Sequence, residues 1–257
     1  MNYFIKVILL FALLFGSSIS EAQVAKDTLF SDPTEFKLKQ VILPASLITI
    51  GIIGLESHTL KDISSGINEE RDEHIDEQLT IDDFAQYSQI ATVYALNAFG
   101  IQGERNFSDR TLVIGTAHFI MSSSVFIIKS TSNVQRPDGS SFNSFPSGHT
   151  ATAFMGAEFL WQEYKGKSLW YGISGYTIAA LTGAFRIYND RHWLNDVVEG
   201  AGIGIMSTKI AYWLLPVIKN MFTKTSKENL EKSSAFSSII LPLVGNNSYG
   251  IAFKASF

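Results

Sequence analysis

The stretch PSGHTATAFMGAEFLW, Pro146–Trp161, combines the start of a helix with a side chain that can transfer a proton. Ser147 is expected to cap the helix, because good helix formers and apolar residues follow it. The free backbone N–H groups of such a first turn, at the positive end of the helix dipole, favour an anion. Gly148 lets the backbone approach that anion closely. The stretch therefore predicts an anion site at a helix start, with His149 beside it.

Two flanking clusters add cations and a second histidine. Lys129, Arg136 and Arg186 can clamp the negative oxygens of a phosphoryl group in its transition state. Asp196 follows His192 by four residues, so on a helix its carboxylate can hold one ring nitrogen of the histidine protonated. The other ring nitrogen is then free as a nucleophile. The histidine at the helix start can give a proton to the leaving oxygen. The pattern predicts a phosphate-transfer site.

The order of these motifs resembles the signature of a known family. Lys, six residues, Arg-Pro, then Pro-Ser-Gly-His, then Arg, five residues, His, three residues and Asp is similar to the pattern of the type 2 phosphatidic acid phosphatases. That superfamily also includes bacterial class A acid phosphatases, glucose-6-phosphatase and vanadium haloperoxidases. The resemblance covers about residues 84–217. It implies that His192 forms a phosphohistidine, that Asp196 orients it and that His149 is the general acid. The phosphate ligands that it implies are Lys129, Arg136, Ser147, Gly148 and Arg186.

The chain departs from the family pattern at two places. Phe185 stands before Arg186 where the family usually has Ser, so one hydroxyl ligand of the phosphate is expected to be missing. The connection between Pro137 and Pro146 is short, with Asp138-Gly139 as its turn, and is expected to lie tightly over the pocket.

The expected reaction is metal-independent hydrolysis of a phosphomonoester or pyrophosphate, of a lipid, because the cations supply the charge that a metal would supply. No cofactor is expected. A vanadate-dependent haloperoxidase would bind vanadate with the same residues that are expected to bind phosphate. A short chain with one helical bundle fits the phosphatases better. An inactive lipid-binding envelope protein is the further alternative, and the presence of every reacting group argues against it.

Composition limits the other possibilities. A chain of 257 residues suits one domain with a substantial core. The net charge of -4 shows no excess of basic residues of the kind that binds nucleic acid, so nucleic acid is not an expected partner. The chain has no cysteine, which excludes disulfides and thiolate metal sites.

The first residues have the plan of a secretory signal peptide. Lys6 precedes the apolar stretch Val7–Phe15, and small residues lead to a cleavage site at Ala22. Residues 1–22 are therefore expected to be removed, with an uncleaved anchor as the alternative. The expected location is a bacterial-type cell envelope, in association with a membrane.

The rest of the chain predicts an all-α fold of six helices. A helical phosphatase domain is expected over residues 23–232, with its motif core at 84–217, and a tail over 233–257. The charged stretch Glu56–Asp83 is expected to be an exposed loop or polar helix, and His118 an interior residue. All three motifs would meet at one end of the bundle. The predicted helices are Val41–Leu55, Phe84–Ile101, Thr111–Ile128, Ser147–Trp161, Ser168–Phe185 and Asp196–Val217.

The orientation at a membrane stays open at this point. The uncharged runs are at or below the length needed to span a bilayer. The distribution of Lys and Arg favours a site facing the periplasm. A cleaved signal peptide followed by three crossings would instead place Lys129 in the cytoplasm. We expect a bundle partly embedded in, or held at, the membrane, with the site facing the periplasm.

The C-terminal residues predict a β-hairpin. Apolar residues alternate over Tyr249–Phe257, and Gly245-Asn246-Asn247 supplies a turn before them. A hairpin packed on the bundle or on a partner is expected, since two strands cannot close a barrel.

Overall fold

The computed structural model describes residues 33–56, 81–234, 237–245 and 248–256. The predicted signal peptide lies outside these residues. The chain forms two compact units, Met1–Trp213 and Leu214–Phe257. The domain boundary expected at residue 232 stays a prediction.

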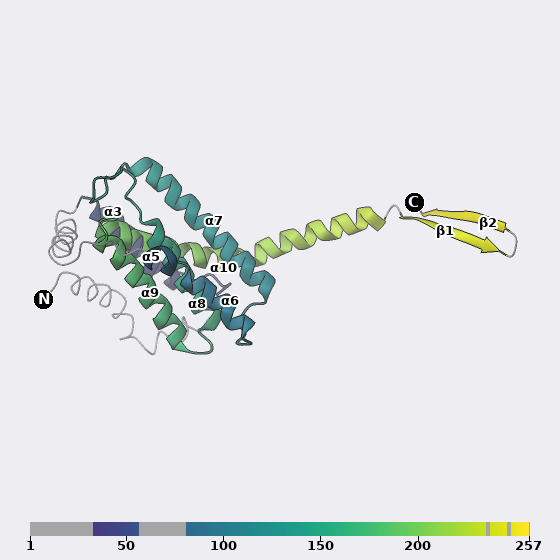
Figure 1. Ribbon diagram of the computed structural model, residues 1–257, viewed down its shortest axis with the longest axis horizontal. Coiled ribbons are helices and arrows are strands. Elements are labelled where there is room, and N and C mark those ends of the chain that lie inside the picture. Colours follow the sequence, from purple (N-terminus) through teal and green to yellow (C-terminus); the bar gives the residue numbers. More distant parts are fainter. Residues whose placement is uncertain (1–32, 57–80, 235–236, 246–247, 257) are drawn as a thin grey trace. The chain divides into compact units, whose positions relative to one another are not determined.

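Seven helices lie in the described part of the chain, and they follow the predicted apolar segments. All six segments fall on helices, and the second of them breaks at residues 86–87 into a five-residue helix and a longer one. The predicted all-α bundle is confirmed. The helices are α3 (Lys39–Gly54), α5 (Ile81–Ala85), α6 (Ser88–Ala98), α7 (Phe107–Ser132), α8 (Gly148–Tyr164), α9 (Leu169–Tyr188) and α10 (Leu194–Ser234) (Figure 1).

Helix α8 is the core of the bundle, since almost every one of its residues is buried. It packs against α6, α7 and α9 (Figure 1). Ala153, Phe154 and Ala157 of α8 share a buried cluster with α9 residues and with the first turns of α10. Because the Pro-Ser-Gly-His stretch opens α8, this packing fixes the backbone around which the site is built.

Glycine lets α10 lie unusually close to the start of α8. A Cβ atom at Gly200 would lie 2.5 Å from the carbonyl oxygen of Ser147. A Cβ atom at Gly204 would overlap the carbonyl oxygen of Ala151, one turn further along. The two glycines therefore bring the second and third turns of α10 against the start of α8.

Gly200→Ala should lower the free energy of unfolding by about 1–3 kcal/mol, because the added methyl group overpacks this contact. Gly115→Ala is the matched control, since a Cβ atom at Gly115 of α7 meets nothing within 4 Å. That substitution should be neutral or stabilising by up to about 1 kcal/mol through helix propensity. Thermal unfolding followed by circular dichroism compares the two. Equal stability of the two variants would contradict the close packing.

Two helices of the described residues are long and apolar enough to cross a membrane: α7 and residues Leu194–Met221 of α10. A core helix of a soluble protein is also long and apolar enough, so the buried share of each helix is used to distinguish a core helix from a membrane-spanning one. The apolar window of α10 is 56% buried, whereas that of α7 is only 28% buried. The exposed side chains of α7 include Phe119, Phe126 and Ile127. Helix α7 thus presents an apolar outer face.

The prediction that His118 lies in the interior is wrong. The buried residues of α7 are Arg110, Val113, Ile114, Ala117, Met121 and Val125, which follow a helical stripe. His118 comes directly after one member of this stripe and is exposed. An apolar run in the sequence therefore does not bury every residue within it, because only one face of α7 packs on the bundle.

The predicted C-terminal hairpin is confirmed within the second unit. Strands β1 (Ser237–Gly245) and β2 (Ser248–Ser256) pair in antiparallel register, with Gly245 opposite Ser248. The apolar positions of the two strands match, since Ile240 pairs with Phe253.

Candidate active site

His192 and Asp196 form a buried pair at the start of α10. His192 lies in the connection after α9, and its Nδ1 is 3.3 Å from Oδ2 of Asp196 in the first turn of α10. The backbone N–H of His192 donates to the carbonyl oxygen of Arg186, which closes the connection. The predicted pairing is present, although His192 precedes the helix and the aspartate reaches back to it.

Burial sets the protonation state of His192. It lowers the pKa of the imidazole to about 4, against the opposing effect of Asp196, and the charges of Lys129 and Arg186 lower it further. The ring is therefore neutral at ordinary pH. With a proton on Nδ1 toward the carboxylate, Nε2 carries a free lone pair.

The carboxylate of Asp196 is held by three donors besides the histidine. It accepts hydrogen bonds from the Ser144 hydroxyl, from the Trp193 backbone N–H at 2.9 Å and from the Asn195 side-chain amide at 3.1 Å. The bond from the residue before the helix makes Asp196 a helix cap as well as the partner of His192. Sequence reasoning missed Ser144, because it lies in an irregular loop without a motif spacing.

Arg186 lies in the last turn of α9 with its guanidinium almost buried. Its Nη1 is 2.6 Å from Oδ2 of Asp82. Its Nε is buried without a hydrogen-bond partner among the residues that the structure describes. A buried N–H without an acceptor is costly, so this donor is available to a bound anion.

The other two predicted cations hold the loop before α8. Nζ of Lys129 donates to the carbonyl oxygens of Asn143 and Ser144, the latter at 3.1 Å. Nε of Arg136 donates to Oδ1 of Asn143 at 3.0 Å. Burial lowers the pKa of Arg136, and the charge of Arg186 adds to this effect. The structure thus gathers three like charges, which a bound anion would stabilise.

The first turn of α8 has the predicted cap. The Ser147 hydroxyl accepts from the backbone N–H of Thr150, and the Ser147 N–H donates to the carbonyl oxygen of Asp196. Both groups of Ser147 are thereby engaged, so its role as a direct phosphate ligand stays a prediction. A Cβ atom at Gly148 would make only ordinary contact with Val125, at 3.8 Å. The fold does not itself require glycine there, which agrees with a close approach by a ligand.

His149 is the second residue of α8 and is partly exposed. Its Nε2 lies 2.9 Å from Oδ1 of Asp83 in α5. The interpretation of Glu56–Asp83 as an exposed loop or polar helix is therefore wrong at its C-terminal end: Asp82 is buried and both aspartates contact predicted site residues. No spacing between motifs predicts these contacts, since more than 60 residues separate the partners. Residues 57–80 of the stretch lie outside the described part.

The connection from α7 to α8 lies beside the site as a tight loop. Gly139 has a φ of 70°, and its N–H donates to the carbonyl oxygen of Arg136, so the expected turn at Asp138-Gly139 is present. Oδ2 of Asp138 lies 3.2 Å from Nη1 of Arg191. This ion pair connects the loop to the segment before α10.

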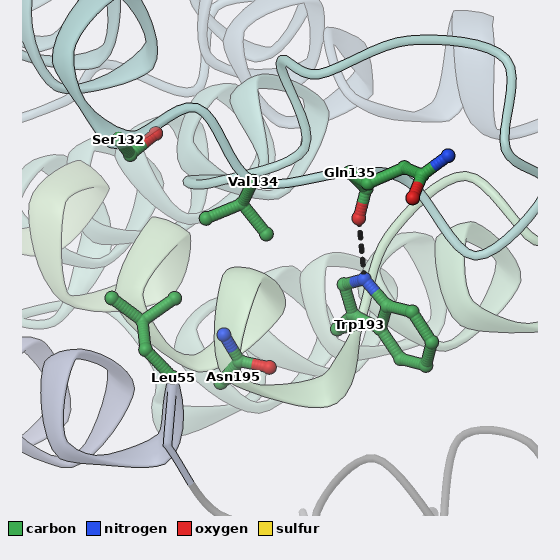
Figure 2. A pocket seen from close by; sticks show the side chains of 6 residues that line it. All are labelled: Leu55, Ser132, Val134, Gln135, Trp193 and Asn195. Atoms are coloured by element: carbon green, nitrogen blue, oxygen red, sulfur yellow. Dashed lines mark hydrogen bonds between the residues drawn. The ribbon is translucent and has the colours of Figure 1, made fainter.

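A cavity of about 470 Å³ opens between this loop and the starts and ends of three helices. Figure 2 shows the indole N–H of Trp193 donating to the backbone oxygen of Gln135 across it, at 2.8 Å. None of the predicted site residues lines the cavity, although Trp193 and Asn195 neighbour His192 and Asp196 in the chain. Its lining residues are Leu55, Ser132, Val134, Gln135, Trp193 and Asn195.

Comparison with known proteins finds similarity over the segment that carries these residues. Residues 112–219 match the model of the PAP2 superfamily, and the matched segment contains all eight predicted site residues. The similarity to this superfamily holds for that segment of the chain. Among similar proteins, the lipid A 1-phosphatase of Porphyromonas gingivalis is 35% identical over 173 residues, which are 66% of this chain and 38% of that protein. The lipid A 1-phosphatase of Helicobacter pylori is 32% identical over 76 residues, which are 30% of this chain and 38% of that protein. The match thus spans less than two fifths of the length of either relative.

Two solved structures are also similar. LpxE of Aquifex aeolicus has 24% sequence identity and a TM-score of 0.46, covering 61% of this chain and 96% of its own. A transmembrane PAP2 type phosphatidylglycerolphosphate phosphatase of Bacillus subtilis has 18% identity and a TM-score of 0.36, covering 86% of this chain and 98% of its own.

Proposed function

We propose that this chain is a metal-independent phosphatase that hydrolyses the phosphomonoester or pyrophosphate of a lipid through a phosphohistidine. The observation that carries the proposal is the buried imidazole of His192, whose Nδ1 lies at hydrogen-bond distance from the carboxylate of Asp196. A buried guanidinium of Arg186 with an unpaired N–H supports it. A neutral nucleophile beside a preset anion cradle is what phosphoryl transfer to a histidine requires.

The reaction follows in two steps. Nε2 of His192 attacks phosphorus while Lys129, Arg136 and Arg186 stabilise the negative equatorial oxygens. The bond to the leaving oxygen breaks, and that oxygen takes a proton from His149. Water then attacks the phosphohistidine and gives a proton to the now neutral His149. Inorganic phosphate leaves, and both histidines return to their starting states.

The substrate class is a lipid phosphate acted on at a membrane. Two relatives are named lipid A 1-phosphatases, which makes a lipid A 1-phosphate the first candidate. The apolar outer face of α7 supports membrane association. We place the site on the periplasmic side, in an envelope protein, as the distribution of basic residues in the sequence favours.

A vanadate-dependent haloperoxidase is the alternative reaction for the same cradle. Orthovanadate mimics the five-coordinate transition state, so in a phosphatase it should inhibit phosphate release competitively. The vanadate-loaded protein should not oxidise bromide with peroxide at a useful rate. An inactive lipid-binding protein would neither release phosphate nor oxidise bromide.

The test is release of inorganic phosphate by the purified full chain, with EDTA present. The panel comprises a lipid A 1-phosphate, phosphatidic acid, an isoprenoid diphosphate and a soluble phosphomonoester. We expect release from at least one lipid, unchanged by EDTA. Halide oxidation with negligible phosphate release would favour the peroxidase, and binding without either reaction would favour the inactive protein.

A further inference from the structure

The short helix α5 brings two adjacent aspartates to two different site residues. Oδ1 of Asp83 lies 2.9 Å from Nε2 of His149 and 3.5 Å from Nη1 of Arg186. Oδ2 of Asp82 lies 2.6 Å from the same Nη1. Helix α5 packs on both α8 and α9, which carry these partners. The carboxylates are therefore part of the site's immediate surroundings, although no motif includes them.

The two aspartates differ in their exposure. The side chain of Asp82 is 1% exposed, and that of Asp83 is 51% exposed. Asp82 thus holds the guanidinium of Arg186 as a buried ion pair, whose disruption would be strongly destabilising. Asp83 is open to solvent on one side, so the fold should tolerate its replacement.

We propose that Asp83 is a positioning residue that keeps the proton on His149, an inference that rests on the phosphatase function proposed above. A carboxylate at hydrogen-bond distance favours the imidazolium over the neutral ring. The imidazolium gives its proton to the leaving oxygen as the bond to phosphorus breaks. Asp83 therefore extends to higher pH the range in which His149 carries its proton.

The charges around His149 set the direction of the effect. Burial lowers its pKa below the usual value, the cation of Arg186 lowers it further, and Asp83 and then Asp82 raise it. Removing the charge of Asp83 should therefore lower the pKa of His149. A general acid must be protonated, so kcat/KM falls as the pH rises through this pKa. Asp83→Asn should therefore shift this fall in kcat/KM, the alkaline limb of the pH profile, to lower pH by about one unit.

A different role for Asp83 gives a different result. Its Oδ1 lies between His149 and Arg186, where an oxygen of a phosphate could also bind. If the carboxylate only blocked this position, Asp83→Asn would lower KM and strengthen inhibition by phosphate, and the alkaline limb would not move.

The direct measurement is the titration of His149 by NMR in the full chain. The chain has five histidines, so replacing each in turn assigns the ring signals. The pKa of His149 should fall by about one unit in Asp83→Asn and return toward the parent value in Asp83→Glu. Glu35→Gln, at an exposed carboxylate paired with Lys37, should leave it unchanged. An unchanged pKa in Asp83→Asn would overturn the inference, and the unperturbed signals of the other histidines show that the variant is folded.

The kinetic test uses two leaving groups. An alkyl phosphate needs protonation as it leaves, whereas p-nitrophenyl phosphate releases a stable phenolate. Asp83→Asn should therefore lower kcat/KM at neutral pH roughly tenfold for the alkyl ester and clearly less for the aryl ester. Equal losses on both substrates would contradict a role through His149. A parent protein that releases no phosphate from any substrate refutes the proposed function, and the NMR titration then still decides whether Asp83 controls His149.

Discussion

His192→Ala should abolish phosphate release, lowering kcat by roughly four orders of magnitude or more, as loss of a covalent nucleophile does in other enzymes. The anion cradle should survive, because Lys129, Arg136 and Arg186 are held by partners other than the histidine. Binding of inorganic phosphate, measured by calorimetry, should therefore persist while turnover is lost.

The matched control for this loss is the exposed histidine of α7. His118→Ala removes an imidazole from the surface and should leave the rate unchanged. Circular dichroism of both variants checks the fold, since His192 is buried. A rate in His192→Ala within about tenfold of the parent would mean that another group attacks phosphorus.

Asp196→Asn should lower the rate of phosphohistidine formation by about two to four orders of magnitude. The amide favours the wrong ring tautomer and cannot stabilise the positive charge that develops on His192. Its oxygen can still accept from the backbone N–H of Trp193, and Asn caps helices nearly as well as Asp. Stability and substrate binding should therefore change little.

Single-turnover kinetics measure this effect, with Asp109→Asn as the control. Asp109 is a half-buried acidic residue in the first turn of α7, which matches the helical position of Asp196 without a histidine beside it. The control should react at the parent rate. If Asp196→Asn did so within a few-fold, the carboxylate would serve only as a helix cap.

The sequence predicted the parts of the fold that depend on local pattern. The cap at Ser147 and the six apolar helices follow from residue types within one or two turns, and both are present. The spacing of His192 and Asp196 predicted their contact, because four residues reach across one turn of backbone. These features need no knowledge of distant segments.

Contacts between distant segments could not be predicted in this way. Asp83 reaches His149 across 66 residues, and Ser144 reaches Asp196 across 52. No periodicity connects such partners, and an acidic stretch is ordinarily solvated. The prediction that His118 is buried was wrong for the converse reason. Its apolar neighbours face the bundle, whereas His118 lies off the buried stripe. Only the packing of α5, α7, α8 and α10 decides these positions.

The phosphoenzyme itself is the most direct test of the central proposal. The full chain is mixed with a ³²P-labelled lipid phosphate that it hydrolyses, quenched within one turnover, digested and mapped by mass spectrometry. We expect the label on His192, in an acid-labile and base-stable bond, and its absence in His192→Ala. Label on any other residue, or turnover without label in a quench that preserves phosphohistidine, would contradict the account.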